Sequence, residues 1–122
     1  KDTGIKERPM HDDEGDTASH LIFMLPSAEA ALCFRSAAAQ AGTQFSIISE
    51  NTWHFAKHWK ALEDMGEKDI FGIRAPSYAP ETMEGTDAIL SRAVMAGLNI
   101  NMSGEEVERI VSSVRYGAKT AL

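Results

Sequence analysis

Short apolar runs separated by turn-forming residues divide the first half of the chain into a strand, a helix and a second strand. Residues 20–25, HLIFML, are continuously apolar after the histidine, which is typical of a buried strand. Ser27 is a suitable N-cap for the alanine-rich helix predicted over residues 28–41, and Gly42 is suited to end it. The alternation in residues 43–49, TQFSIIS, predicts the second strand.

The middle of the chain combines helical spacing with a long loop. Apolar residues recur at helical spacing over residues 52–65, so we expect a helix there. Residues 66–82 contain several Gly and Pro residues and predict the longest loop, and loops of that length are usually functional or part of an interface. A short helix is expected over residues 86–97, followed by a third strand over residues 98–102.

The last segment carries the clearest helix signals. Ser103 and Glu106 form the S-x-x-E pattern of a capping box, which marks a helix N-terminus. The apolar residues that follow share one helical face: Val107, Ile110, Val111, Val114 and Ala118. We therefore expect this helix to pack through one side only.

Together these elements predict an α+β fold, with a small, three- to four-stranded, largely antiparallel sheet and helices packed on it. A chain of 122 residues can form one domain with a single core. Residues 1–19 are rich in charges and turn formers, so we expect a connecting segment or a first edge strand there and the domain proper over residues 20–122. The chain begins without an initiator Met, so we expect a piece of a longer protein.

Composition excludes several classes of partner. The net charge of −6 and the scattered basic residues argue against nucleic acid, whose binding proteins usually carry a basic stripe. No apolar run approaches the roughly 18 residues of a membrane span, so we expect no membrane partner and a cytoplasmic protein. The one cysteine, Cys33, allows no disulfide framework and fits a reducing compartment. Because Cys33 lies in the alanine-rich helix, we expect a buried structural thiol.

The chain lacks a self-sufficient catalytic or metal-binding set. His54 and His58 have the i,i+4 spacing of two metal ligands, but the H-E-x-x-H pattern and a third ligand are missing, so no metal is predicted. The acidic residues within 12–16 lack the spacing of a calcium loop and predict a solvated turn. Neither a G-x-S-x-G elbow nor a phosphate-binding glycine loop is present. No catalytic residue is therefore predicted in this chain.

A patch of polar and aromatic residues remains as a candidate binding site. Asn51, Trp53 and His54 lie at the predicted strand-to-helix junction, where side chains can project over a sheet edge towards a ligand. Arg92 is the one basic residue in the apolar run AILSRAVMAGL, so it must face a partner, solvent or an anion. The alternative, in which the tryptophans belong to the core and Arg92 caps a helix end, stays open.

Three segments resemble the C-terminal region of the DegT/DnrJ/EryC1/StrS aminotransferases, which are fold-type I pyridoxal-phosphate enzymes acting mostly on keto-sugars. The segments are GDTASHLIFMLPSAEAALCFRSAAAQAG (15–42), SENTWHFAKHWKAL (49–62) and AILSRAVMAGLNINMSGEEVERIVSSV (88–114). In that family a strand ending in Leu-Pro leads into a helix that closes on Gly, and the last helix follows a Ser or Thr and acidic residues. NTWHFAKHW looks closest to a branch with an Asn-x-Trp-His segment followed by a Trp.

The resemblance implies that the chain is the small domain of a longer enzyme, usually a homodimer. The cofactor lysine, the aspartate paired to the pyridine nitrogen and the stacking aromatic lie in the family's large pyridoxal-phosphate-binding domain. None maps here, so this chain alone is predicted to be inactive and to hold no cofactor-binding residue. Asn51, Trp53 and His54 match the segment that borders the keto-sugar pocket, and Arg92 matches a position beside the carboxylate or phosphate end of a substrate. The family usually has a tyrosine or a His-Tyr-Pro pattern where this chain has NTWHF, which leaves the exact substrate open.

Two alternatives remain beside this interpretation. The chain could be a stand-alone α+β binding or interaction module, in which residues 66–82 and the tryptophans form a protein interface, where Trp is enriched. It could also belong to a pyridoxal-phosphate-dependent sugar dehydratase, which shares the fold and cofactor and differs at a residue outside this chain. The interpretation as a domain of a longer enzyme predicts an exposed apolar face on the isolated chain.

Overall fold

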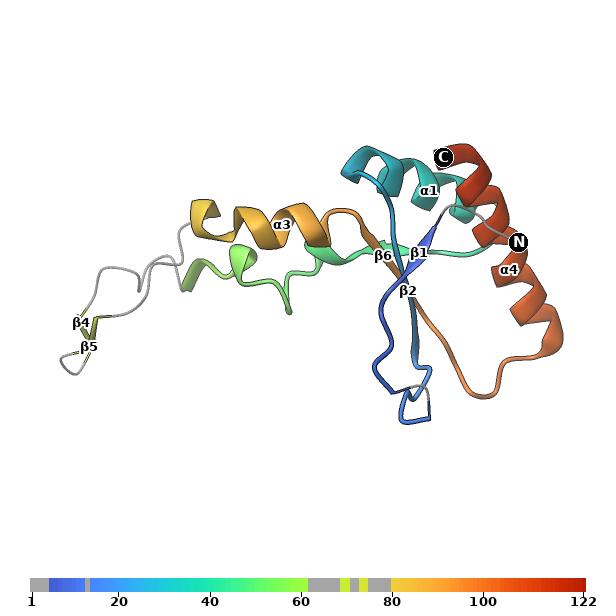
Figure 1. Cartoon of the computed structure of the whole chain (residues 1–122), viewed down its shortest axis with the longest axis horizontal. Helices are drawn as coiled ribbons and strands as arrows, with labels where there is room; N and C mark the ends of the chain where they lie inside the picture. Colours follow the sequence, from blue (N-terminus) through green and yellow to red (C-terminus); the bar gives the residue numbers. More distant parts are fainter. Residues whose placement is uncertain (1–4, 13, 62–68, 71–72, 75–79) are drawn as a thin grey trace.

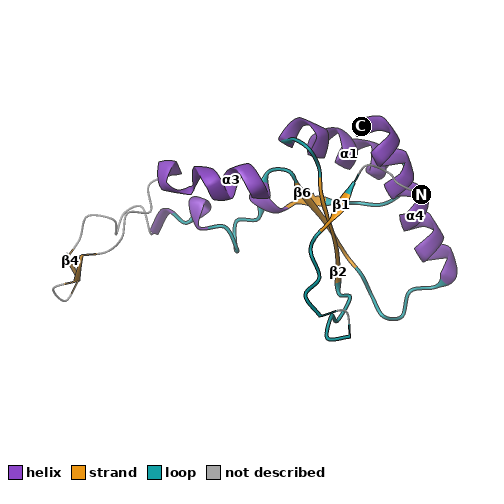
Figure 2. Cartoon of the chain, in the orientation of Figure 1, coloured by secondary structure: helices purple, strands orange, loops and turns teal. Residues whose placement is uncertain are grey.

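The computed structural model describes residues 5–12, 14–61, 69–70, 73–74 and 80–122, and a four-stranded sheet lies at its centre. The strand order is β1-β2-β6-β3, and each neighbouring pair is antiparallel. The strands are β1 (Lys6–Glu7), β2 (His20–Met24), β3 (Ser46–Ile47) and β6 (Ala93–Gly97). Figure 2 shows the helices lying outside this sheet, so the predicted α+β class is confirmed.

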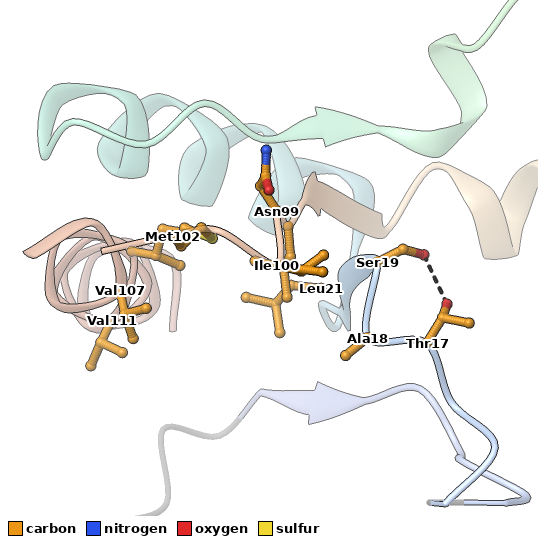
Figure 3. A pocket seen from close by; sticks show the side chains of 11 residues that line it. Thr17, Ala18, Ser19, Leu21, Asn99, Ile100, Met102, Val107 and Val111 are labelled. Carbon is orange, nitrogen blue, oxygen red and sulfur yellow. Dashed lines mark hydrogen bonds between the residues drawn. The ribbon is translucent and has the colours of Figure 1, made fainter. Parts of the chain in front are cut away.

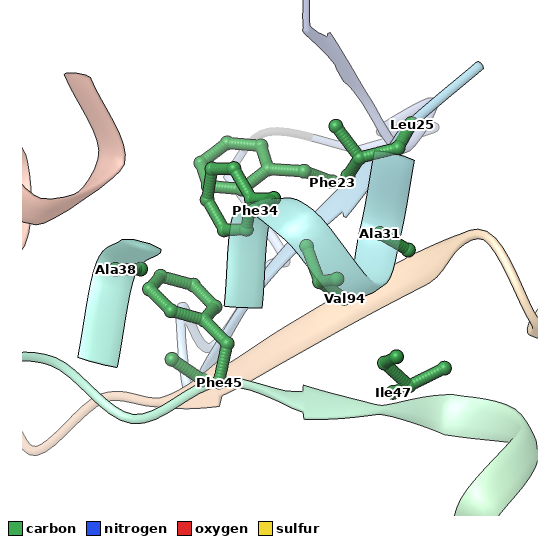
Figure 4. Close-up of a cluster of buried hydrophobic side chains, with 9 residues drawn as sticks. Phe23, Leu25, Ala31, Phe34, Ala38, Phe45, Ile47 and Val94 are labelled. Atoms are coloured by element: carbon green, nitrogen blue, oxygen red, sulfur yellow. The ribbon is translucent and has the colours of Figure 1, made fainter. Parts of the chain in front are cut away.

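One face of the sheet and the helix α1 (Ala28–Gln40) enclose the hydrophobic core. Phe23 of β2 lies opposite Val94 of β6, and both side chains are buried. Phe34 of α1 is completely buried, with its ring 6.3 Å from that of Phe23 and 5.2 Å from that of Phe45, centroid to centroid. Both contacts are edge-to-face, the geometry that aromatic rings prefer (Figure 4). This aromatic cluster anchors α1 on the sheet.

The ends of α1 are those that the sequence predicts. The Ser27 hydroxyl accepts a hydrogen bond of 3.2 Å from the Ala30 amide, which satisfies one of the free N–H groups of the first turn. Gly42 has a φ angle of +101°, in the left-handed region where a side chain is strained and glycine is not. The chain therefore turns directly after α1 and runs back along the sheet as β3.

The last helix, α4 (Gly104–Ala121), begins at the predicted capping box and packs against α1. The Ser103 hydroxyl accepts from the Glu106 amide at 3.2 Å, and the Glu106 carboxylate accepts from the Ser103 amide at 2.8 Å. Further along, the buried Ser113 hydroxyl donates to the Ala41 carbonyl oxygen at 2.9 Å. This bond joins α4 to the end of α1. No helix in the described ranges is long and apolar enough to cross a membrane.

The helix predicted over 86–97 is confirmed only over residues 86–90, and the strand predicted over 98–102 is wrong. The helix α3 (Glu84–Leu90) ends before Ser91, and the following five residues form β6. The alanines and methionine of AVMAG favour a helix locally. In the structure, however, β6 pairs with β2 on one side and β3 on the other. Burial of Val94 between these strands and α1 outweighs local preference, because strand propensity depends on tertiary context.

Of the helix predicted over 52–65, only Lys60 and Ala61 are α-helical in the described part. Residues 52–54 form a turn, and residues 56–58 form the short 3-10 helix η2 (Ala56–His58). This segment and α3 lie side by side and extend away from the sheet, and we call them the arm (Figure 1). The predicted loop over 66–82 lies largely outside the described residues. Its described parts are β4 (Asp69–Ile70), β5 (Ile73–Arg74) and the first residues of the 3-10 helix η3 (Pro80–Met83).

Cys33 is exposed, which corrects the expectation of a buried thiol. Its neighbour Phe34 points into the core, and successive helical residues point about 100° apart, so Cys33 lies off the buried face. The thiol donates to the Thr120 carbonyl oxygen of α4 at 3.5 Å. Cys33 therefore lies at the edge of the contact between α1 and α4.

Candidate functional site

A turn capped by Asn51 forms the centre of the candidate site. Asn51 follows the 3-10 helix η1 (Ile48–Glu50), which continues directly from β3. Its side-chain oxygen, Oδ1, accepts hydrogen bonds from the backbone N–H groups of Trp53 at 2.9 Å and His54 at 3.0 Å. Asparagine suits such a turn because its short amide can replace a backbone carbonyl. The sequence thus places Trp53 and His54 on a turn that the preceding residue holds in shape.

Trp53 and His54 both face solvent. Trp53 is 82% exposed, an unusual state for an indole ring, and His54 is also exposed. Within the described residues neither side chain makes a hydrogen bond. The alternative that the tryptophans form the core is therefore wrong for Trp53, whose ring is available to a ligand or partner.

Three consecutive residues fasten this turn from its C-terminal side. The His58 Nε2 atom lies 2.6 Å from the Ser49 carbonyl oxygen, and the Trp59 indole N–H donates to the Thr52 carbonyl oxygen at 3.0 Å. The Lys57 ammonium pairs with the Asp87 carboxylate of α3. Residues 49–59, which we call the site loop, are thus tied both to themselves and to α3.

The buried anchor of the site loop is Phe55, which the sequence analysis did not single out. Phe55 is 4% exposed, and its ring packs edge-on against the His58 ring with centroids 5.6 Å apart. Phe55, which follows the exposed Trp53 and His54 and precedes η2, is therefore the aromatic residue that packs the site loop against the protein. Its only signal in the sequence was that Phe is more often buried than Trp or His.

The pair His54 and His58 does not act together in this structure. The His58 ring nitrogen contacts a backbone carbonyl within the site loop, while the His54 ring faces solvent. In the parts of the chain that the structure describes, no three His, Cys, Asp or Glu side chains are placed to share a metal ion. The two histidines thus have separate surroundings.

Arg92 lies in the connection between α3 and β6. Its backbone N–H donates to the Ile89 carbonyl oxygen at 3.3 Å, and its carbonyl oxygen accepts from the Leu25 amide at 2.9 Å. The side chain is half-buried. Because η1 contacts both α3 and β6, Arg92 borders the same junction as Asn51. No hydrogen bond or ion pair links its guanidinium group to the described residues, so Arg92 is near the site loop without being bonded to it.

A second feature is an apolar cavity of about 490 Å³ between the end of the sheet and α4 (Figure 3). Leu21 and Leu98 line it from the sheet side, and Val107 and Val111 line it from α4. Ile100 at its edge is 96% exposed. The predicted apolar stripe of α4 is therefore divided: its C-terminal part packs on the core, and its N-terminal part faces this open cavity.

A smaller cavity of about 260 Å³ borders the turn that holds the acidic residues. The Asp12 carboxylate accepts from the Gly15 amide at 3.0 Å, and the Asp16 carboxylate accepts from the Ala18 amide at 2.6 Å and pairs with Arg8. The hydrogen bond from the Ala18 amide lowers the pKa of Asp16 below its ordinary value; desolvation opposes this shift and Arg8 adds to it. These carboxylates shape an exposed turn, which is the role that the sequence predicts.

The described residues do not fit a pyridoxal phosphate site. The Schiff-base lysine of such a site needs a free amino group in a sheltered pocket. Lys57 pairs with Asp87, and no lysine lines either of the two cavities. No chemical step through that cofactor is assigned to this chain. In comparison with known proteins, no family model matches the sequence.

Proposed function

We propose that the chain is the C-terminal small domain of a pyridoxal-phosphate-dependent aminotransferase that acts on a keto-sugar. The intact enzyme, a cytoplasmic homodimer of the DegT/DnrJ/EryC1/StrS family, would transfer an amino group from glutamate to the sugar ketone. Its closest branch would be that of the transaminase that forms 8-amino-3,8-dideoxy-manno-octulosonate. Pyridoxal phosphate, bound by the large domain, supplies the electron sink for this chemistry.

The observation that carries this proposal is the exposed pair Trp53 and His54 on the turn held by Asn51. An indole face can stack on the C–H face of a sugar ring, and an imidazole can exchange hydrogen bonds with sugar hydroxyls. Arg92, near the same junction, offers a planar cation that can hold a carboxylate or phosphate by two hydrogen bonds. The three side chains together suit a polar sugar that carries an anionic group.

Exposed apolar side chains favour the proposal that another domain of the same enzyme packs against this chain. Ile100 is almost fully exposed beside the larger cavity. On the sheet face opposite α1, the side chains of Ile22, Met24 and Met95 are only half-buried. Large contiguous apolar surfaces on a protein usually mark contacts. The large domain of the same enzyme is the partner that this proposal assigns to them.

The exposed tryptophan also favours a second candidate function. Trp53, with the half-exposed Trp59 and Ile89 of α3, gives the arm three large apolar side chains that face solvent. Tryptophan is enriched in the energetically dominant parts of protein interfaces, so a stand-alone interaction module would use the arm as its contact surface. The sugar dehydratase alternative is equally compatible with this chain, because the residue that distinguishes a dehydratase from an aminotransferase would lie outside residues 1–122.

Two substitutions in the intact enzyme test the proposed function. His54→Ala and Arg92→Ala are each expected to lower kcat/KM for the keto-sugar by about tenfold or more, the size of one lost hydrogen bond to a charged or polar substrate. The content of bound pyridoxal phosphate should stay unchanged. His11→Ala and Arg115→Ala, at exposed positions away from the site loop, are the matched controls. Normal kinetics in both site variants would contradict the assignment of this site.

A further inference from the structure

We propose that Asn51 is a positioning residue that holds Trp53 and His54 in place, and that it does not itself bind the substrate through its oxygen. This inference rests on the proposed function and changes the role of one of its residues. The ligand-facing group of the site loop is then the exposed Trp53 ring, with His54 beside it. The substrate it fits is a sugar that presents a continuous C–H face to the indole.

The hydrogen bonds of Asn51 lead to this assignment. An amide oxygen has two lone pairs, and the Oδ1 atom of Asn51 already accepts two hydrogen bonds, from the Trp53 and His54 amides. The Asn51 backbone N–H is also engaged, because it donates to the Ile48 carbonyl oxygen at 3.0 Å. Within the side chain, the NH₂ group remains for a ligand. The capping function of Asn51 therefore depends on its oxygen, and any direct substrate contact would depend on its nitrogen.

The same turn is held on its other side by side chains from η2 and its C-cap. The His58 ring contacts the carbonyl oxygen of Ser49, and the Trp59 indole N–H donates to the carbonyl oxygen of Thr52. These two backbone contacts lie before and after Asn51 in the sequence. Phe55 is buried immediately after His54 and fixes the chain where the turn ends. A loop that is already ordered loses less conformational entropy when a ligand binds. The crowding of aromatic and histidine residues in this segment thus has a structural cause.

The surroundings of Trp53 favour a sugar face over a simple anion at this position. Lys57, the lysine of the site loop, is paired with Asp87, and Arg35 is paired with Glu50 of the same loop, so neither is free to bind an anion. An exposed indole ring without its own hydrogen-bond partner in the described residues offers apolar, polarizable surface. The anionic end of the substrate would then lie towards Arg92. In this arrangement Trp53 would contact the sugar ring of the substrate, and Arg92 would bind its anionic group.

Three substitutions of Asn51 separate the two roles. Asn51→Asp and Asn51→Ser keep an oxygen that can cap the turn but remove the NH₂ group, whereas Asn51→Ala removes both. In the intact enzyme we expect Asn51→Ala to raise the KM for the keto-sugar by about tenfold, as for a lost cap, with a smaller change in kcat. Asn51→Asp and Asn51→Ser should restore KM to within about threefold of the wild type. Equal losses in all three variants would overturn the positioning role while leaving the proposed function intact, and so would an unchanged KM in Asn51→Ala.

A spectroscopic measurement on the 122-residue chain tests the positioning role without any activity. Both tryptophans are labelled as fluorotryptophan and observed by fluorine NMR. Asn51→Ala should shift and broaden the Trp53 signal, and Asn51→Asp should return it to the wild-type position. A Trp53 signal that is identical in wild type and Asn51→Ala would overturn the inference. If the wild-type enzyme fails to convert keto-sugars, the proposed function fails, and this spectrum still decides whether Asn51 positions the turn.

Discussion

Gly117 of α4 lies directly against the ring of Phe34 in α1. A Cβ atom at position 117 would lie 2.8 Å from the Phe34 Cδ2 atom and 3.1 Å from the Phe34 carbonyl oxygen. Gly117 is buried and Phe34 is completely buried, so neither can move into solvent. The absence of a side chain at this position lets the two helices approach closely and holds Phe34 over the sheet.

Gly117→Ala is therefore expected to destabilise the protein. Overpacking of a tight core costs about 1–3 kcal/mol, which exceeds the gain of about 1 kcal/mol or less from replacing glycine by alanine in a helix. Gly104→Ala in the same helix is the control, because a Cβ there would meet no atom within 4 Å. Urea unfolding should show a lower midpoint for Gly117→Ala and no loss for Gly104→Ala. A stabilised Gly117→Ala variant would show that α1 and α4 are not packed this closely.

The capping box at Ser103 and Glu106 gives a second prediction. Ser103→Ala should lower the free energy of unfolding by about 1 kcal/mol, since it removes the N-cap of α4. Ser112→Ala, at an exposed position in the middle of α4, is the matched control and should be neutral or slightly stabilising. Equal stabilities of the two variants, measured by urea unfolding, would contradict the capping role.

The same box predicts a pH dependence. Hydrogen bonds from the Ser103 backbone N–H and hydroxyl group lower the pKa of Glu106 in the folded chain; desolvation opposes this shift, and the charge of Arg109 adds to it. A carboxyl group whose folded pKa is lowered stabilises the fold fully above its unfolded pKa, about 4.3 for glutamate, and loses this contribution as pH falls through the folded value. Glu106→Gln should therefore flatten the acid limb of the stability curve, measured by urea unfolding between neutral pH and the acid range. An unchanged acid limb would mean that this carboxylate is not held by Ser103.

The ion pair between Lys57 and Asp87 is predicted to hold the arm together locally. Both side chains are about one-third exposed, so the pair should contribute about 1 kcal/mol or less to global stability and weaken with salt. Asp87→Asn should speed amide hydrogen exchange in the site loop and α3 while leaving α4 unchanged. Glu84→Gln, at an exposed position of the same helix, is the control. Faster exchange in α4, or no change in the site loop, would contradict this role.

Local signals were sufficient to predict the parts of the fold that depend on neighbouring residues. Ser27 and Gly42 mark the ends of α1, and the capping box at Ser103 marks the start of α4, because caps act within one turn of helix. β6 was missed because its stability comes from two strands that are distant in the sequence. The residues of AVMAG do not by themselves indicate that the segment pairs with β2 and β3.

The sequence indicated which residues form the candidate site, but it did not indicate the turn on which they lie. The clustering of Asn51, Trp53 and His54 indicated a polar-aromatic surface, and their position after a strand is confirmed. The turn at residues 52–54 was not predicted, because the spacing of Trp53, Ala56 and Trp59 matches a helical period and suggested a helix instead. The bonds from His58 and Trp59 back to main-chain carbonyls could not be predicted from residue types alone.

The proposed function makes this chain the small domain of a pyridoxal-phosphate-dependent keto-sugar aminotransferase. The most direct test uses the natural full-length protein that contains these residues, reduced with borohydride, digested and analysed by mass spectrometry. A parallel sample is incubated with glutamate and the keto-sugar acid that corresponds to the amino-octulosonate product. We expect a pyridoxyl-modified lysine outside residues 1–122 and glutamate-dependent formation of the amino sugar. A folded full-length protein with no modified lysine and no amino sugar, or with the modification on a lysine within residues 1–122, would contradict it.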